Sequence, residues 1–461
     1  MAQLADSSNR PPDSVHAAGD RAGFEQPIGH PSDSSQSANA QSANAPSEAD
    51  AAERTAPERT SDEATGALHI VTIAIEETEQ GHLVRLRGSA GEATAPFLSP
   101  LTAAELTTFW QAVADTPAQQ APPGAVADLA RTIGETLYRA LLTDEQADLL
   151  RQSYLNAYQA RMPLQLRLQL DATPEFLTLP WEYLFEPVRQ EFPALSLHSP
   201  FVRHTQLMHR IRPLPVTGPL RALVVIANPS THPDFNSRRT WLNLLDTLDY
   251  LAADRRLLLE RLQKPTLHDL QRQLRSNDYH ILHFIGHAQY DRDSQEGRLV
   301  FEDEMRRGRL VSGHHLGQML RDNYATRLVI LQAAMEHVDV RNPMGIVAHH
   351  LIPRGVPATA MLPFTMTDGL TAAFFHELYA EVAAFKPVDV AMTEARNAMI
   401  VEGGGLLWGA PWLLSRMDEG FLFDNGHLPV RSKPRPRRRT PSLLERVLRS
   451  NLAGRSFDEF E

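Results

Sequence analysis

The chain has 461 residues, of which 42% are hydrophobic, and it contains no cysteine. This length and hydrophobic content are typical of a soluble globular protein with two or three domains. The formal net charge of −11 gives no overall reason to expect nucleic-acid binding. The missing cysteines exclude disulfides, thiolate metal sites and a cysteine nucleophile in the chain as written.

Residues 1–67 are rich in Ser, Ala, Asp, Glu, Pro and Asn and contain very few large apolar side chains. Such a segment cannot bury enough surface to offset the entropy lost on ordering, so we expect it to be disordered, as a solvated extension, a tether or a regulatory tail. Its start has no basic stretch followed by an apolar core, and no apolar run in the chain approaches the ~18 residues of a membrane span. We therefore expect a cytoplasmic protein with no signal peptide and no membrane span.

The sequence pattern of residues 68–163 predicts an accessory region, which consists of a hairpin followed by helices. Apolar and polar residues alternate over His69–Glu76 and His82–Arg87 around a Glu-Gln-Gly turn, a pattern typical of a β-hairpin. Thr102, with Glu105 three residues later, indicates a helix N-terminus with a capping box. Apolar residues at helical spacing predict two further helices, over about Val126–Leu142 and Asp144–Ala160.

Residues 164–425 show repeated strands separated by helical stretches, which indicates an α/β fold with a mostly parallel sheet covered on both sides. The expected strands are Leu164–Leu170, Leu220–Ala227, Tyr279–Ile285, Arg327–Leu331 and Val356–Leu362, with a small hairpin over Arg298–Phe301 and Arg309–Val311. The expected helices are Trp241–Leu262, Leu267–Leu274 after a Thr266 cap, Ser312–Leu320, Met344–Ile352, Thr367–Phe385 and Asp389–Ile400. Trp181 supplies a large apolar surface, and we expect it to pack in the core.

The composition of residues 426–461 predicts a basic, largely disordered tail. The tail carries the run Lys-Pro-Arg-Pro-Arg-Arg-Arg from Lys433 to Arg439, and a basic proline-rich run is usually flexible. Pro441–Leu452 has leucines at helical spacing and could dock on a partner or an anionic surface.

The stretch Tyr279–Ala288, reading YHILHFIGHA, is where we expect the chemistry to be centred. Its apolar run is typical of a strand covered on both faces, Gly286 interrupts the run, and His287 follows. Groups beyond the carboxyl ends of parallel strands line the ligand crevice of an open sheet, so a histidine there can face a substrate. Arg327–Glu336 has the same shape, an apolar strand followed by a turn of small residues, and its turn should lie beside the first.

Eight stretches of the chain match one family in the family's own order. They are LPWEYL at 179–184, PLRALVVIANP at 219–229, KPTLHDLQRQL at 264–274, YHILHFIGHA at 279–288, RLVILQAAME at 327–336, GIVAHHLIPRGVPATAMLPFTMTD at 345–368, DVAMTEARNAMI at 389–400 and LWGAPWLL at 407–414. With these, the chain from about Leu164 to Phe423 resembles the CHAT domain, a caspase-like branch of the cysteine peptidases related to separase. The resemblance implies a caspase-like, mostly parallel sheet flanked by helices and a cysteine endopeptidase acting on protein substrates. The accessory α+β region and the disordered termini fall outside it.

The resemblance assigns roles to three positions. His287 takes the place of the family's catalytic histidine, and Ala334 takes the place of the nucleophilic cysteine, because the family pattern there is Leu-x-Ala-Cys. The backbone N–H groups of Ala288 and Ala334 would form the oxyanion hole, provided that the turn at Ala288 does not require positive φ. We expect the imidazole of His287 and the methyl group of Ala334 to face each other across a shared groove.

Alanine at position 334 is a decisive departure from the family pattern, because a methyl group cannot replace the attacking thiolate. No Ser, Thr or Cys in Leu331–Asp339 could act as a substitute. Two explanations fit. The first is a Cys→Ala substitution in an active peptidase, which the retained His287 favours slightly. The second is a natural pseudopeptidase that keeps the cleft as a peptide-binding or scaffolding module.

The substrate pocket, cofactors and partners follow mainly from the resemblance. Relatives often hold a basic side chain in an acidic pocket, so Glu336, Asp339 and Asp368 are candidates for that pocket, although solvated loop acids are an equally good interpretation. No motif calls for a metal or a cofactor. The expected partners are a protein or peptide substrate and a regulatory protein that gates the site together with the terminal segments, with no nucleic acid.

Overall fold

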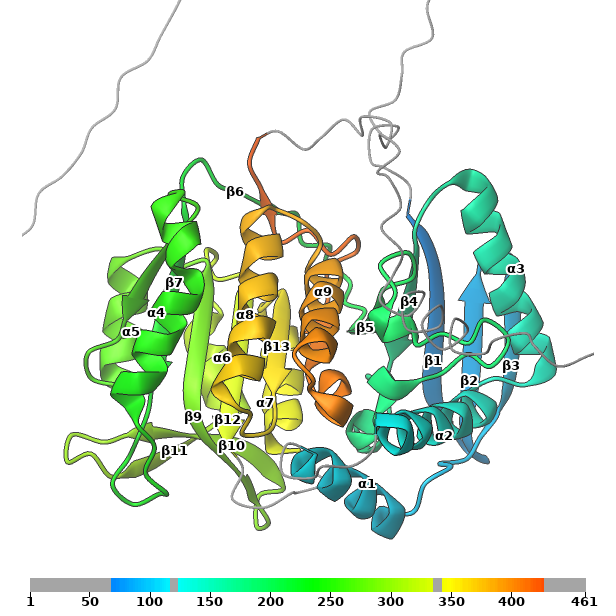
Figure 1. The fold of residues 1–461 in the computed structure, drawn as a ribbon, viewed down its shortest axis with the longest axis horizontal. Helices are drawn as coiled ribbons and strands as arrows, with labels where there is room; N and C mark the ends of the chain where they lie inside the picture. Colours follow the sequence, from blue (N-terminus) through cyan, green and yellow to red (C-terminus); the bar gives the residue numbers. More distant parts are fainter. Residues whose placement is uncertain (1–67, 117–122, 335–341, 427–461) are drawn as a thin grey trace, which may run out of the picture. The chain divides into compact units, whose positions relative to one another are not determined.

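The computed structural model describes residues 68–116, 123–334 and 342–426. Within these residues one mixed sheet has 13 strands (Figure 1). In spatial order, 11 of them are β11 (Gly308–Ser312), β10 (Glu296–Glu302), β9 (Ile281–Asp291), β12 (Leu328–Ala334), β13 (Ala358–Leu362), β14 (Trp412–Ser415), β5 (Phe201–His204), β4 (Leu164–Gln169), β1 (His69–Thr78), β2 (Gly81–Gly88) and β3 (Gly91–Phe97). The other two are β7 (Leu220–Ile226), which pairs with β9, and β8 (Leu257–Arg261), which pairs with β7. A separate two-stranded sheet joins β15 (Phe423–Asp424) to β6 (Leu214–Pro215).

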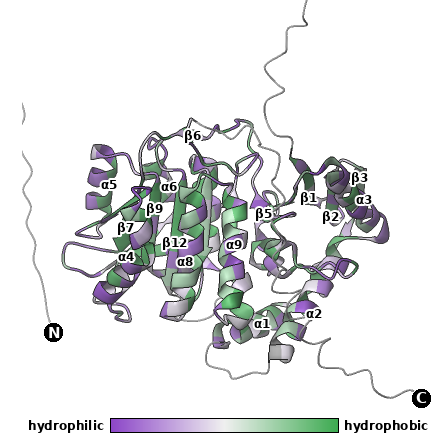
Figure 2. Ribbon diagram, turned by 45° about the horizontal axis from the view of Figure 1, so that its top comes forward, coloured by the Kyte–Doolittle hydropathy of each residue, from purple (hydrophilic) through white to green (hydrophobic). Residues whose placement is uncertain are grey.

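The strands β8, β7, β9, β12 and β13 pair in parallel and form the part of the sheet that carries the candidate site. The residues of β7, β12 and β13 are mostly buried apolar side chains, as strands with both faces covered require, whereas β8 alternates buried and more exposed residues. Figure 2 shows hydrophobic colour along β9 and β12. The predicted mostly parallel sheet flanked by helices is confirmed.

The helices pack on the sheet and on one another. They are α1 (Ala103–Asp115), α2 (Pro123–Leu141), α3 (Asp144–Ala160), α4 (Ser237–Ala253), α5 (Leu267–Ser276), α6 (Gly313–Leu320), α7 (Pro343–Leu351), α8 (Asp368–Ala383) and α9 (Val388–Val401). Short 3-10 turns are η1 (Pro174–Thr178), η2 (Trp181–Tyr183), η3 (Pro193–Leu195), η4 (Ile352–Arg354) and η5 (Gly405–Gly409). Helices α4, α8 and α9 lie side by side (Figure 1). No helix within the described ranges is long and apolar enough to cross a membrane.

Several helices begin directly after the capping residues that the sequence indicates. Thr102 and Glu105 form a capping box, in which the Thr102 N–H donates to the Glu105 carboxylate over 2.8 Å. The side chains of Thr266, Ser312 and Thr367 accept hydrogen bonds from the first turns of α5, α6 and α8. Each side chain satisfies a backbone donor that the helix itself leaves unpaired.

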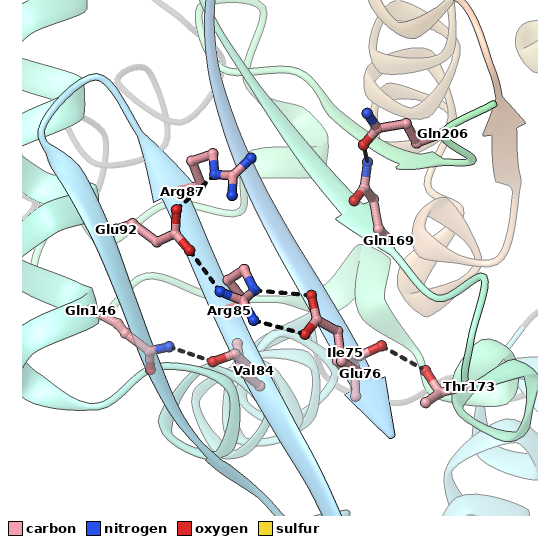
Figure 3. A network of polar contacts seen from close by, with 10 residues as sticks. All are labelled: Ile75, Glu76, Val84, Arg85, Arg87, Glu92, Gln146, Gln169, Thr173 and Gln206. Atoms are coloured by element: carbon pink, nitrogen blue, oxygen red, sulfur yellow. Dashed lines mark hydrogen bonds and ion pairs between the residues drawn. The ribbon is translucent and has the colours of Figure 1, made fainter. Parts of the chain in front are cut away.

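The predicted N-terminal hairpin is present, and β3 extends it to three strands. Arg85 on β2 donates to Glu76 on β1 over 3.0 Å and to Glu92 on β3 over 2.7 Å (Figure 3). These ion pairs are partly exposed, so they help to fix the strand register more than they add stability. The hairpin continues the large sheet because β1 pairs in parallel with β4. The division of the chain at residues 163/164 stays a prediction.

The prediction of one helix over Trp241–Leu262 is wrong. Helix α4 ends at Ala253, Arg255 adopts a φ of 55°, and the following residues form strand β8. The three leucines from Leu257 to Leu259 suit a helix and a strand equally well by composition. Pairing with β7 decides for the strand, with Leu257 buried and Leu258 exposed in alternation.

A buried ion cluster surrounds the LPWEYL turn. Trp181 is 0% exposed, which confirms its place in the core, and the adjacent Glu182 carboxylate accepts two hydrogen bonds from Arg203 on β5, over 2.9 and 2.6 Å. The Arg203 guanidinium also lies 3.8 Å from the ring centre of Trp412 on β14. Arg396 on α9 approaches the Glu182 carboxylate to 3.9 Å and donates to the backbone carbonyl of Pro411. Glu182 therefore joins the turn to β5 and α9.

Candidate functional site

His287 lies where β9 changes partners. Strand β7 pairs with β9 only as far as Ile226 and Ile285. Beyond that point β10 pairs with the same side of β9 in antiparallel fashion, and Val300 is the partner of His287. The expectation that the strand breaks at Gly286 is therefore wrong, because the β10 ladder keeps the chain extended to Asp291. His287 nevertheless lies at the carboxyl end of the parallel pairing, which was the basis for choosing it.

The parallel pairing of β9 with β12 brings the two predicted catalytic positions together. The register runs from Leu328 beside Ile281 to Ala334 beside His287. Neighbouring strands lie about 4.8 Å apart, so the two backbones are separated by about that distance here. Ala288 follows in the extended strand and pairs with Leu299 of β10, so its backbone does not need the left-handed conformation.

Gly286 precedes His287 where two backbones approach closely. A Cβ atom at this position would lie 3.0 Å from the carbonyl oxygen of Ala227, which follows β7, and 2.9 Å from the Phe284 ring. Ala227 itself donates its N–H to the carbonyl of Ile285 over 2.9 Å. Glycine at 286 thus serves close packing of the β7 end against β9, and it does not end the strand.

The face of β9 that carries His287 also carries His283, two pleats earlier. His283 is 0% exposed, and its Nδ1 lies 3.0 Å from the Tyr379 hydroxyl of α8. Burial lowers the pKa of His283 from 6.5 to about 3, against a smaller opposing effect of a hydrogen bond with Gln332. This histidine belongs to the core.

His283 should make the fold sensitive to acid. The unfolded chain protonates this imidazole near pH 6.5 and the folded chain only near pH 3, so its stabilising contribution is present above pH 6.5 and is lost as pH falls toward 3. Between pH 7 and pH 5 the loss is about 2 kcal/mol. Denaturant unfolding at pH 7 and at pH 5 measures the fall in the free energy of unfolding. This fall should be about 2 kcal/mol smaller in a His283→Gln variant than in the unaltered chain.

The control for this prediction is His268→Gln, which changes an exposed histidine on α5. It should follow the parent at both pH values. If His283→Gln also shows the parent's pH dependence, acid does not act through this buried imidazole.

Two aromatic rings from the loop after β7 contact His287. The His232 ring centre lies 5.5 Å away at a tilt of 34°, and the Phe235 ring centre lies 5.8 Å away, edge to face. His232 is held by hydrogen bonds on both sides, to Thr231 Oγ1 over 3.1 Å and to Gln289 Nε2 over 2.9 Å. The loop therefore packs a fixed second imidazole against the candidate catalytic one.

Asn228 holds this loop in a closed turn. Its side-chain amide donates to the Asp234 carboxylate over 2.6 Å and to the Phe235 carbonyl over 2.7 Å. Its backbone N–H donates to the Glu302 carboxylate on β10 over 2.9 Å. The loop is thus tied both to itself and to the strand that pairs with His287.

A pocket of about 360 Å³ opens beside His287, between α4, α8 and the carboxyl ends of β9 and β12. Its wall includes His287, Gln332, Asp234 and Asp368. His287 is only 4% exposed, so the small surface that it keeps faces this pocket. A pocket at the carboxyl ends of parallel strands is where an α/β sheet binds ligands.

The predicted pocket acids have different outcomes. Asp368, the first residue of α8, lines the pocket and pairs with Arg239 of α4 over 2.5 Å. Glu336 and Asp339 lie outside the described residues. Sequence reasoning missed His232 and Asp234, although the Asn-Pro pair at the end of β7 marked their loop as lying at the same edge of the sheet.

Among the residues that the structure places, no group of three or more His, Asp or Glu side chains is arranged to hold a metal ion. The site offers an imidazole beside a mostly apolar pocket. An imidazole in such a position can accept or donate a proton for a bound substrate.

Comparison with known proteins gives one family match and distant structural neighbours. No curated protein matches the chain. Chains of the Saccharomyces cerevisiae separase–securin complex, solved at 3.0 and 2.6 Å, are 12% identical, with TM-scores of 0.42 and 0.36. The alignments cover 76% and 75% of this chain and 30% of each separase–securin chain, so this chain spans less than a third of their length. The family model of the CHAT domain matches residues 131–405, more than half of the chain, and the protein therefore belongs to the CHAT domain family.

Proposed function

We propose that this chain is a CHAT cysteine endopeptidase by descent, that it acts on protein substrates through His287 and residue 334, and that Ala334 makes it inactive as written. The observation that carries the proposal is the β9–β12 register, which pairs residue 334 with His287, together with the position of His287 in the wall of a pocket. In this reaction a thiolate attacks the peptide carbonyl, and the imidazole takes and returns the proton.

The distance between the strands suits such a dyad. Paired residues on adjacent strands share a face of the sheet, and their backbones are about 4.8 Å apart. A cysteine side chain at 334 could therefore reach hydrogen-bonding distance of the imidazole of His287 without moving either strand. Ala334 of the chain as written lacks the sulfur, so the imidazole has no nucleophile to activate.

The proposed oxyanion hole uses the backbone N–H groups of Ala288 and residue 334. Ala288 is in extended backbone, so its position does not require the positive φ that alanine would disfavour. Glu336, Asp339 and Asp368 stay proposed pocket residues, and Asp368 at the pocket wall is the one that the described residues support. A regulatory protein partner and a cytoplasmic location also belong to the proposal.

A second candidate function is a peptide-binding or scaffolding module without catalysis. Ala334 itself favours it, because the cleft and His287 are kept while the nucleophile is absent. Both candidates require the cleft to bind a peptide. They differ in whether chemistry returns once a thiol is restored.

The test restores that thiol. The parent has no cysteine, so Ala334→Cys creates the only thiol in the chain. A peptidyl acyloxymethyl ketone alkylates an activated thiol when the neighbouring cleft binds the peptide part of the reagent. It should label Ala334→Cys and should fail to label Ala334→Cys/His287→Ala. Intact-protein mass spectrometry measures the labelled fraction.

The matched control is Ala252→Cys, an exposed position on α4 away from the pocket. It should react with iodoacetamide, which needs only an accessible thiol, and should not react with the peptidyl reagent. Equal slow labelling of Ala334→Cys and Ala252→Cys would rule out the peptidase proposal and leave the binding module.

A further inference from the structure

We infer that the pocket beside His287 takes an uncharged aromatic or large aliphatic side chain of the bound peptide, and that Arg239 keeps its rim acid Asp368 from selecting a basic one. This inference rests on the proposed function, because it specifies the peptide that the site would hold. It differs from the acidic, base-selective pocket that the family resemblance suggested.

The deep part of the pocket is apolar. Phe375 of α8 and Leu244 of α4 line it from opposite helices and are 1% and 5% exposed. Ile285, two residues before His287 on the same face of β9, is also 5% exposed and forms its floor. Phe235, from the loop that Asn228 closes, adds an aromatic wall. A planar or branched hydrocarbon side chain would replace water at every one of these surfaces.

Both carboxylates in the described wall are at the exposed rim, and both already have partners. Asp368 pairs with Arg239 over 2.5 Å, which balances its charge. Asp234 accepts a hydrogen bond from the Asn228 amide over 2.6 Å, which also holds the loop closed. A new cation at the rim would have to compete with a guanidinium that is anchored on the same protein.

A basic side chain would therefore bind poorly. The charge of arginine or lysine is at the end of the side chain, so insertion would carry it past the rim acids to the apolar floor. Moving a charged group out of water is strongly disfavoured when no oppositely charged group pairs with it. An aromatic ring meets no such penalty, and 360 Å³ is large enough to hold one.

The test uses two small probes on the unaltered chain, so it needs no nucleophile. N-acetyl-phenylalanine amide and N-acetyl-arginine amide are titrated while NMR follows the Gly286 backbone amide and the His287 imidazole. We expect the phenylalanine probe to shift both signals saturably, with a Kd at least ~10-fold lower than that of the arginine probe.

Three variants make the test specific. Ala372→Phe, on the pocket wall of α8, should fill the space and abolish the response to the phenylalanine probe. Arg239→Gln should free Asp368 and strengthen binding of the arginine probe at least ~3-fold. Arg238→Gln, which removes a neighbouring exposed charge of the same helix, should change neither affinity.

The outcomes separate this inference from the proposed function. Tighter or equal binding of the arginine probe overturns the inference, and so does the absence of saturable shifts at Gly286 with either probe. If the phenylalanine probe binds as expected while Ala334→Cys remains unreactive, the inference stands and the peptidase proposal fails.

Discussion

An Ala334→Cys chain is expected to hydrolyse peptides, and adding His287→Ala is expected to lower kcat/KM by at least ~10³-fold. The parent, with a methyl group in place of the nucleophile, should show no hydrolysis above the uncatalysed rate. The difference arises because an imidazole one strand away can hold the thiol as a thiolate and then protonate the leaving amine.

The pH profile provides a separate check on the same pair. A free thiol ionises near pH ~8.5, and a neighbouring imidazolium lowers that value. The acid limb of kcat/KM for Ala334→Cys should therefore lie below pH ~8.5 and should move up toward it in the His287→Ala background. Matched fluorogenic peptides with phenylalanine, leucine, arginine or lysine beside the cleaved bond serve as substrates.

An acid limb that stays in place when His287 is removed would show that the imidazole does not act on the thiol.

A His232→Phe variant in the Ala334→Cys background keeps a ring against His287 and loses the hydrogen bonds to Thr231 and Gln289. It tests whether the neighbouring ring alone supports the activity.

Glu182→Ala is expected to destabilise the fold by about 3–5 kcal/mol. Glu182 is 1% exposed and balances Arg203, which is equally buried. Removing the carboxylate would leave the guanidinium in the core with only the backbone carbonyls of Leu177 and Leu179 and the Trp412 ring as partners. Equilibrium denaturation in urea measures the change in the free energy of unfolding.

The control for Glu182→Ala is Glu135→Ala on α2, which removes two partly exposed pairs with Arg131 and Arg139. Such pairs contribute little, so the loss should stay within about 1 kcal/mol. Similar losses in the two variants would mean that the buried cluster is not more important to stability than a surface pair.

The sequence was sufficient to predict the parallel sheet, most helices and the neighbourhood of His287. Apolar runs mark buried strands, and capping residues such as Thr266 and Ser312 mark helix starts, because both signals are local. The pairing of His287 with Ala334 also followed, because carboxyl ends of adjacent parallel strands meet at one edge.

The rest depended on contacts between distant segments. The β10 ladder that carries β9 past Gly286 and the strand β8 are decided by pairing partners, which local spacing does not specify. The polar partners of Glu182 and Asp368 lie 21 and 129 residues away along the chain. Whether an acid is available to a substrate or already neutralised therefore could not be read from its own surroundings in the sequence.

The parallel pairing of β1 with β4 has a practical consequence for anyone who shortens this protein. A fragment that begins at residue 164 would strip β4 of the neighbour that covers one side of it from His69 to Ala74. The freed amides and carbonyls would form a bare template for another chain, and β4 is a run of almost wholly buried residues. Such a fragment would be prone to self-association, so a shortened chain should keep the hairpin at its start.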